Sequence, residues 1–157
     1  MINQLLKYFI DFIYGTKKVE RKFKAEHPNE AVLTSDACKG ISPHQDKDVK
    51  GGSDWVTAQR AVILLTDKRI VCGKWDIPLS SITDAHLIEY SSLFSSGQVL
   101  KIQTENGKFY QFGMQKNPEW INQSALPLAL EKGQSINIVF RILFWLIILG
   151  YLAYSFI

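Results

Sequence analysis

Basic side chains gather near the N-terminus of this 157-residue chain, where they form its most distinctive candidate for binding chemistry. Residues 1–24 contain six lysines and arginines against two acidic residues, a net charge of +4, whereas the rest of the chain sums to −1. A local excess of this kind favours an anionic surface as the partner and argues against a nucleic acid. The candidate lipid- or anion-binding residues of this cluster are Lys17, Lys18, Arg21, Lys22 and Lys24.

Reactive side chains elsewhere are not spaced for catalysis or metal binding. Cys38 and Cys72 are far apart in the sequence, and the histidines His27, His44 and His86 form no ligand-spaced set with them. We therefore expect reduced structural thiols, no metal and no cofactor. The sequence also shows no nucleophile–base arrangement, pair of catalytic carboxylates or glycine-rich phosphate loop. These features favour a binding protein over an enzyme.

The elements that would position the basic cluster begin with an amphipathic helix predicted over residues 1–15, followed by a basic linker over 16–27. Lys7 and Asp11 fall on the polar side of this helix, and Gly15 is a plausible end. The apolar stripe either lies in a membrane interface, with the basic cluster on anionic headgroups, or packs against the domain or a partner. The interfacial residues would be Leu5, Leu6, Phe9, Phe12 and Ile13, joined by Ile2.

The last twenty residues, 138–157, are almost wholly apolar and contain one charge, Arg141. As a helix they would span about 30 Å, the thickness of the hydrocarbon core of a bilayer. Because all other basic residues precede this segment and none follows it, the positive-inside rule places the N-terminal domain on the cytoplasmic side. The sequence thus predicts a C-terminal transmembrane helix, acting as a single-pass tail anchor.

Between these ends, residues 28–132 read as one β-rich domain. Residues 105–108 (ENGK) give the clearest hairpin signal, between strands predicted over 99–104 and 109–114. A two-residue turn would put Tyr110 and Phe112 outside, whereas one bulged residue brings the apolar side chains to one face, so we favour the bulge. That face would hold Leu100, Ile102, Tyr110, Phe112 and Met114.

A short helix should close the domain. Asn117 is a suitable N-cap, Pro118 suits the first turn, and the helix should run to about residue 125 with Trp120, Ile121 and Leu126 directed inward. The expected fold is therefore mainly β: six or seven antiparallel strands in a bent sheet or split barrel, capped by one α-helix.

Several motifs of this region, in order along the chain, resemble those of bacterial PH-like and GRAM-like domains. They are 61–70 (AVILLTDKRI), 77–83 (IPLSSIT), 107–113 (GKFYQFG) and 117–120 (NPEW). The resemblance covers about residues 28–130. It implies a seven-stranded, strongly bent sheet plugged by a helix, and a binding module rather than an enzyme.

The same resemblance places Lys68 and Arg69 in a β-hairpin, where such cations can meet phosphates. We expect Arg69 to pair with Asp67 or another nearby carboxylate, which leaves Lys68 as a further candidate for anion binding. Trp55 and Trp75 are expected at core or rim positions.

The leading hypothesis is a membrane-anchored PH-like binding module that acts as an adaptor or accessory protein at the cytoplasmic membrane face. Its partner would be a membrane protein or anionic lipid headgroups. An alternative is a structural subunit of a larger membrane complex, including a homo-oligomer. An enzyme with an unrecognised site is the third reading.

Overall fold

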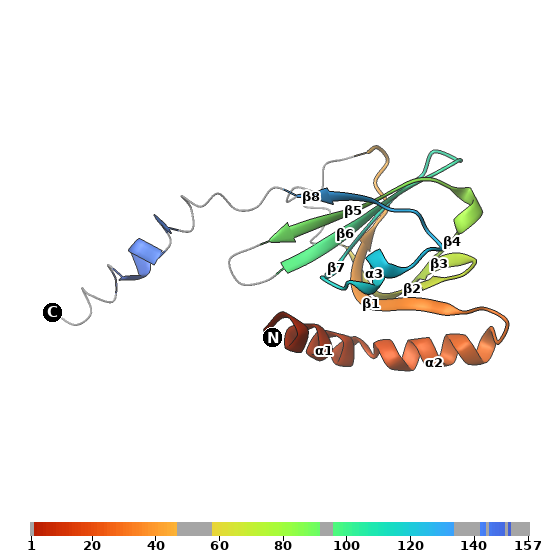
Figure 1. The fold of residues 1–157 in the computed structure, drawn as a ribbon, viewed down its shortest axis with the longest axis horizontal. Coiled ribbons are helices and arrows are strands. Elements are labelled where there is room, and N and C mark those ends of the chain that lie inside the picture. Colours follow the sequence, from red (N-terminus) through yellow and green to blue (C-terminus); the bar gives the residue numbers. More distant parts are fainter. Residues whose placement is uncertain are drawn as a thin grey trace.

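The computed structural model describes residues 2–46, 58–91, 96–133, 142–143, 145–149 and 151. Within these ranges, two N-terminal helices precede a sheet of eight strands (Figure 1). The helices are α1 (Ile2–Tyr14), α2 (Thr16–Glu26), a 3-10 turn η2 (Leu79–Ser81) and α3 (Glu119–Asn122). The strands are β1 (Val32–Ile41), β2 (Gln59–Thr66), β3 (Arg69–Cys72), β4 (Trp75–Pro78), β5 (Ile82–Ser91), β6 (Ser96–Thr104), β7 (Phe109–Gln115) and β8 (Ala129–Lys132).

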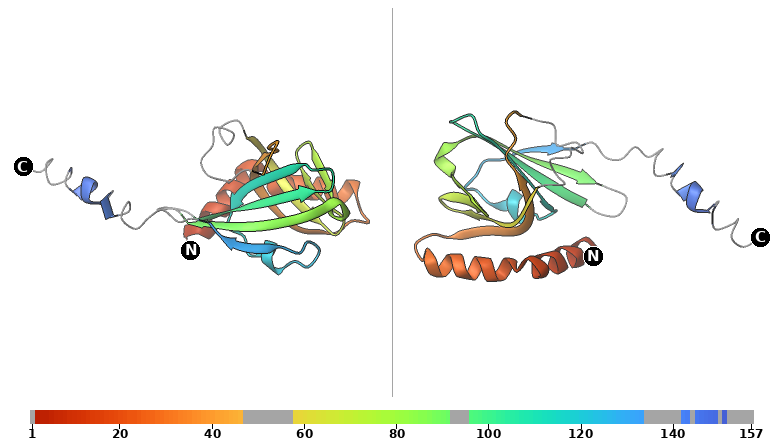
Figure 2. Two further views of the ribbon diagram at one scale, coloured as in Figure 1. Left: turned by 90° about the horizontal axis from the view of Figure 1, so that it is seen from above. Right: turned by 180° about the vertical axis from the view of Figure 1, so that it is seen from behind.

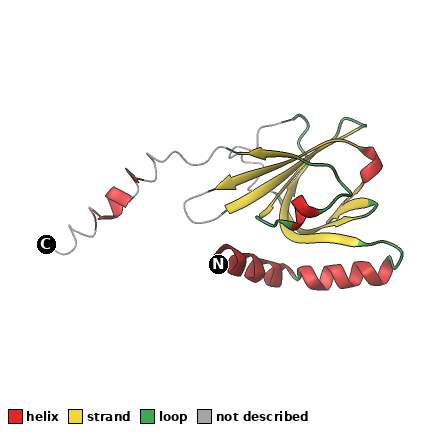
Figure 3. Cartoon of the chain, viewed as in Figure 1, coloured by secondary structure: helices red, strands yellow, loops and turns green. Residues whose placement is uncertain are grey.

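The strands are hydrogen-bonded in the order β4-β3-β2-β1-β7-β6-β5-β8. The pairs between β1 and β7 are antiparallel, as are those within β1–β4 and β5–β7, and β8 adds to β5 in parallel. The sheet bends strongly around α3, and α1 and α2 lie along its outer side next to β1 (Figure 3). The predicted mainly β domain is therefore confirmed, although β8 was not anticipated.

Apolar side chains from both halves of the sheet form one core inside the bend. Alternate residues of β2 point into it, with Ile63 and Leu65 fully buried. Trp120 fills the centre from α3 and is also fully buried. Cys38 and Cys72 lie in this core as free thiols, with their sulfurs 3.3 Å apart. Because strand residues alternate between faces, the same strands can bury a second cluster on the outer side.

The β6–β7 hairpin has the bulged register that hydrophobic patterning favoured. Ile102 pairs with Tyr110 and Leu100 with Phe112, one residue out of step with a two-residue turn at Asn106-Gly107. Gly107 takes the left-handed φ of 73° that this turn requires. The five apolar residues predicted to share a face are all buried in the core.

The closing helix α3 is shorter than expected, a single turn over Glu119–Asn122. The N-cap position is Pro118 rather than the predicted Asn117, but the Asn117 side chain still accepts the backbone N–H of Glu119 at 3.0 Å. The Gln123 side chain donates to the carbonyls of Trp120 and Leu126 and accepts the N–H of Leu126, which ends the helix early. Trp120 and Leu126 point inward as predicted, but Ile121 is exposed.

The prediction of a C-terminal transmembrane helix is wrong. Among the residues that the structure describes, none of the helices combines the length and apolar composition needed to cross a bilayer. Crossing takes about 20 consecutive helical residues. Part of the predicted span 138–157 lies outside the described residues, as does Trp55. The predicted single-pass, tail-anchored and cytoplasmic-facing topology requires that helix and is therefore wrong as well.

Candidate functional site

The N-terminal segment forms two helices that lie almost end to end along the outer side of the sheet (Figures 1 and 2). Residues 16–26, expected as a linker, form the helix α2. Gly15 joins the two helices in the left-handed conformation at φ 65°, which glycine adopts without strain. Since both helices rest on the same side of the sheet, their outward faces together form one surface. We call this surface, built from the exposed residues of α1 and α2, the outer helical surface.

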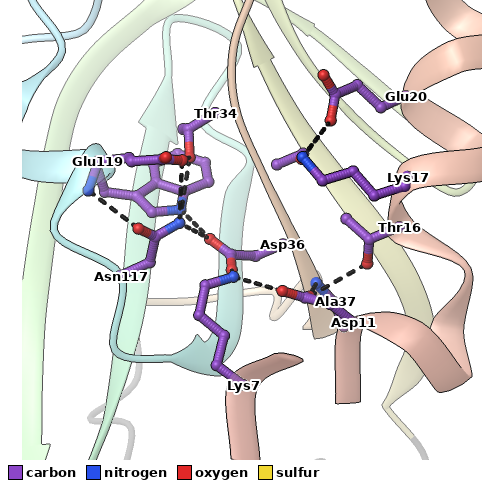
Figure 4. Close-up of polar contacts among 12 residues, drawn as sticks. Lys7, Asp11, Thr16, Lys17, Glu20, Thr34, Asp36, Ala37, Asn117 and Glu119 are labelled. Atoms are coloured by element: carbon purple, nitrogen blue, oxygen red, sulfur yellow. Dashed lines mark hydrogen bonds and ion pairs between the residues drawn. The ribbon is translucent and has the colours of Figure 1, made fainter. Parts of the chain in front are cut away.

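The polar face of α1 is the face that contacts the domain (Figure 4). Asp11 accepts a hydrogen bond from the backbone N–H of Ala37 in β1 at 3.0 Å and from the Thr16 hydroxyl at 3.2 Å. It also forms an ion pair with Lys7 at 2.5 Å. These contacts occupy both oxygens of the Asp11 carboxylate and fix the rotation of α1 about its axis.

Asp36 in β1 extends this network into the interior. Its side chain is 1% exposed and is paired with Lys7, whose side chain is 19% exposed. It also accepts hydrogen bonds from Asn117 Nδ2 at 2.8 Å and from Trp120 Nε1 at 2.7 Å. One buried carboxylate therefore connects α1 to the segment that begins α3.

Burial and pairing act on these groups in opposite directions. Burial raises the pKa of the Asp36 carboxyl, and the Lys7, Asn117 and Trp120 donors offset only part of that effect. Burial lowers the pKa of Lys7, but its hydrogen bonds and charge interactions with Asp11 and Asp36 outweigh this, so the pKa is raised. Lys7 therefore stays protonated as the one cation that pairs with both carboxylates.

The inward face of α2 contacts the sheet through one apolar and one acidic residue. Phe23 packs with Val62 and Leu64, the residues of β2 that point away from the main core. Glu20 accepts a hydrogen bond from the Ser35 hydroxyl at 3.1 Å and pairs with Lys24 at 2.6 Å. These contacts turn the remaining basic residues of α2 away from the sheet.

The apolar face of α1 is exposed on the outer helical surface. Phe12 is 83% exposed and Leu5 is 73% exposed, and Phe9, Ile13 and Tyr8 are exposed as well. Leu6 is half-buried and borders the same apolar patch. The sequence left open whether this stripe meets a membrane or packs against the domain or a partner. The exposure of these residues excludes packing against the domain. Large apolar side chains gathered on one exposed helix face are a typical mark of an interaction site.

The basic residues occupy the part of the outer helical surface formed by α2. Lys17 and Lys22 have side chains that are 84% and 76% exposed, and Lys18, Arg21 and Lys24 are exposed too. Several take part in ion pairs along the helix, including Lys22 with Glu26 at 3.8 Å. The structure thus brings together the five basic residues and the apolar stripe that the sequence singled out.

Lys68 and Arg69 are placed elsewhere: Lys68 lies in the turn between β2 and β3, and Arg69 is the first residue of β3. Arg69 pairs with the buried Glu30 at 3.0 Å and with Asp76 at 2.7 Å, which confirms a structural carboxylate partner. The Glu30 pKa is lowered, chiefly by the hydrogen bond from Arg69. Lys68 Nζ donates to the carbonyl of Asn29 at 3.0 Å, so its ammonium is also part of the local structure.

The described residues contain no group of three or more metal-ligating side chains. Burial and the neighbouring Cys72 thiol, whose hydrogen bond has the larger effect, raise the pKa of Cys38, which disfavours a reactive thiolate. Sequence reasoning placed Lys7 and Asp11 only on the polar side of the first helix and Asn117 only at the start of the closing helix, and it did not identify Asp36. Asp36 follows Thr34 and Ser35 in β1, and its sequence neighbours give no signal for its role, because its partners Lys7 and Trp120 are distant in the chain.

No protein-family model matches this chain, and no curated protein is significantly similar to it. The resemblance to PH-like and GRAM-like domains therefore stays a prediction.

Proposed function

We propose that this protein is a binding module for anionic membrane surfaces, which it contacts through the outer helical surface. The observation that carries the proposal is the exposure, on one surface, of the apolar stripe of α1 beside the basic face of α2. Helices that lie in a membrane interface combine these two features: apolar side chains enter the acyl boundary and lysines meet the headgroups.

The charge on α2 favours an anionic bilayer over a neutral one. Each basic residue near an anionic membrane surface contributes about 1 kcal/mol. Lys17, Lys18, Arg21 and Lys22 together would contribute about 4 kcal/mol, which corresponds to roughly a thousandfold in affinity at low salt. This contribution decreases as salt screens the charges.

The apolar stripe supplies a contribution that salt does not screen. Complete burial of a phenylalanine side chain is worth about 1.5–3 kcal/mol. Phe9 and Phe12 are already largely exposed in the folded chain, so most of this gain is available on entering a bilayer. The two residues together should contribute about 2–4 kcal/mol.

The test is co-sedimentation of the full chain with phosphatidylcholine vesicles that contain or lack phosphatidylserine, at low and high salt. Lys17→Gln/Lys18→Gln/Arg21→Gln/Lys22→Gln should abolish the dependence on phosphatidylserine, and Phe9→Ser/Phe12→Ser should weaken binding at both salt concentrations. A matched control removes three lysines and one arginine from exposed positions elsewhere: Arg60→Gln/Lys74→Gln/Lys108→Gln/Lys132→Gln.

The control should bind almost as tightly as the wild type. Equal loss of binding in the α2 variant and the control would mean that net charge, rather than the outer helical surface, drives binding. Unchanged binding of both test variants would refute the proposal. If the wild-type chain did not bind anionic vesicles but self-associated through Phe9 and Phe12, the surface would be a binding site for a second copy of the chain instead.

A further inference from the structure

A cleft opens beside the outer helical surface, at the junction of α1 and α2. Residues of the two helices line one side, and the segment 116–119 before and into α3 lines the other. The cleft has a volume of about 580 Å³, within the range of small-molecule sites. Tyr8 and Phe12 of the apolar stripe border it, so the cleft meets the surface that we assign to the membrane.

Five cations line this cleft: Lys7, Lys17, Lys18, Arg21 and Lys116. Three of them have carboxylate partners: Lys7 with Asp11 and Asp36, Lys17 with Glu20 at 3.6 Å, and Lys116 with Glu89 at 2.8 Å. Among the described residues, no carboxylate pairs with Lys18 or Arg21.

The acidic residues that line the cleft already have donors from the protein. Asp11 accepts from Lys7, Thr16 and Ala37, as described above. Glu119 accepts from the Thr34 hydroxyl at 3.1 Å and lies 3.5 Å from Asn117 Nδ2. Asp11 is therefore largely engaged by protein donors, and Glu119 through its Oε2, whereas Lys18 and Arg21 are the cations with charge to offer a ligand.

Arg21 has the geometry for an oxyanion. Its Nε donates to the Lys17 carbonyl at 3.2 Å, which steadies the guanidinium and leaves its terminal amino groups for another acceptor. A planar guanidinium binds phosphate through two parallel hydrogen bonds, and an adjacent lysine adds a point charge. The first turn of α2, an 11-residue helix without a side-chain cap, also lines the cleft. Its Lys18 N–H already donates to the Gly15 carbonyl at 2.9 Å, but the positive end of the helix dipole favours an anion there.

From this geometry we propose that the cleft binds a phosphate monoester, with Lys18 and Arg21 as its principal ligands and Lys116 facing them from the segment before α3. A monoester carries more negative charge than the phosphodiester of ordinary phospholipids, which suits a site with two cations free of carboxylates. The inference rests on the proposed function, since the bordering Phe12 would place the cleft at headgroup level.

The test compares binding of the full chain to phosphatidylcholine vesicles that contain phosphatidic acid or phosphatidylserine, adjusted to the same zeta potential. Phosphatidic acid supplies the monoester, and the matched potential removes the general effect of charge. We expect wild-type affinity to be about tenfold higher for phosphatidic acid, the size of effect that one charge-assisted hydrogen bond produces.

Lys18→Gln/Arg21→Gln should abolish this preference. The matched control is Lys22→Gln/Lys24→Gln, which removes two charges from the same helix but none from the cleft lining. The control should weaken binding to both lipids equally and keep the preference. Added inorganic phosphate distinguishes a lipid headgroup from free phosphate as the ligand. If it weakens binding to phosphatidic acid vesicles selectively, the free anion also occupies the cleft. If it weakens binding to both kinds of vesicle equally, the effect is screening and the site is assigned to the lipid.

The outcomes separate the two proposals. Equal wild-type binding to the two vesicles would overturn the phosphate cleft and leave the membrane-binding function intact. A preference that survives in Lys18→Gln/Arg21→Gln would also overturn it. Failure to bind either vesicle would refute the membrane-binding function itself.

Discussion

Replacing Lys7 with methionine tests whether the buried network holds α1 against the domain with its apolar face outward. Methionine matches lysine closely in helix propensity and length, so helix formation itself is hardly affected. The substitution removes the cation that neutralises Asp36, whose side chain is 1% exposed. Asp11 keeps its hydrogen bonds from Thr16 and Ala37.

The expected loss of stability follows from the burial of Asp36. Removing one partner of a buried ion pair costs about 3–5 kcal/mol, because the remaining charge is left without compensation. Asn117 and Trp120 still donate to Asp36, so the lower end of this range, about 3 kcal/mol, is appropriate. With a urea m-value of about 2 kcal/mol per molar, the unfolding midpoint should fall by about 1.5 M.

The measurement is urea unfolding followed by tryptophan fluorescence, for which buried Trp120 is a reporter. Lys22→Met is the matched control: its side chain is 76% exposed and only loosely paired with Glu26, so its stability should change by less than about 0.5 kcal/mol. Lys7→Met/Asp36→Asn should recover part of the loss, since the second change removes the unpaired charge.

Hydrogen exchange gives a second readout. Amides of α1 should exchange faster in Lys7→Met than in the control, because the helix loses its connection to Asp36. If Lys7→Met were as stable as Lys22→Met, and α1 equally protected in both, the network would not hold the helix and the reasoning would fail.

Two further substitutions test the sheet. The hydrogen bond to Asp84, together with that to Glu131, raises the pKa of His86, so the stabilising contribution of these contacts is complete below about pH 6.5 and is lost as pH rises through the raised pKa. In thermal melts from about pH 6 to 9, the melting temperature of the wild type should therefore fall relative to that of His86→Asn, and parallel curves for the two proteins would refute this prediction. A Cβ on Gly40 would overlap the Trp75 indole, so Gly40→Ala should cost about 1–3 kcal/mol in urea unfolding, and a neutral result would show that the indole moves aside.

The sheet was largely predictable because local chemistry determines it. Asn106-Gly107 with its flanking apolar residues specifies both the hairpin and its bulge, since a slip of one residue would expose Tyr110 and Phe112. The early end of α3 was not predictable. It depends on the Gln123 side chain, which donates to the carbonyl of Trp120 within the helix and bonds the carbonyl and N–H of Leu126 beyond it.

The helical surface could be predicted only in part. The pattern of residues 2–14 gives the helix and its two faces, but not which face meets the sheet. That choice depends on Asp36, which is 29 residues from its partner Lys7, and on the backbone N–H of Ala37, which is 26 residues from its acceptor Asp11. A transmembrane segment was inferred from apolar composition over 138–157, yet composition alone does not establish a continuous helix of the required length.

The helix α1 contacts the domain through its polar face, and this arrangement has a consequence for binding. An amphipathic helix that folds only on a membrane must lose backbone entropy, about 1–2 kcal/mol per residue, as it binds. In this chain Lys7 and Asp11 hold α1 as a helix on the domain, so much of that cost is met during folding. The polar face makes the intramolecular contacts, and the exposed apolar residues of α1, among them Leu5, Phe9 and Phe12, are left for a partner. A buried carboxylate such as Asp36 is a weak source of stability, and its value here lies in fixing which face of α1 points outward.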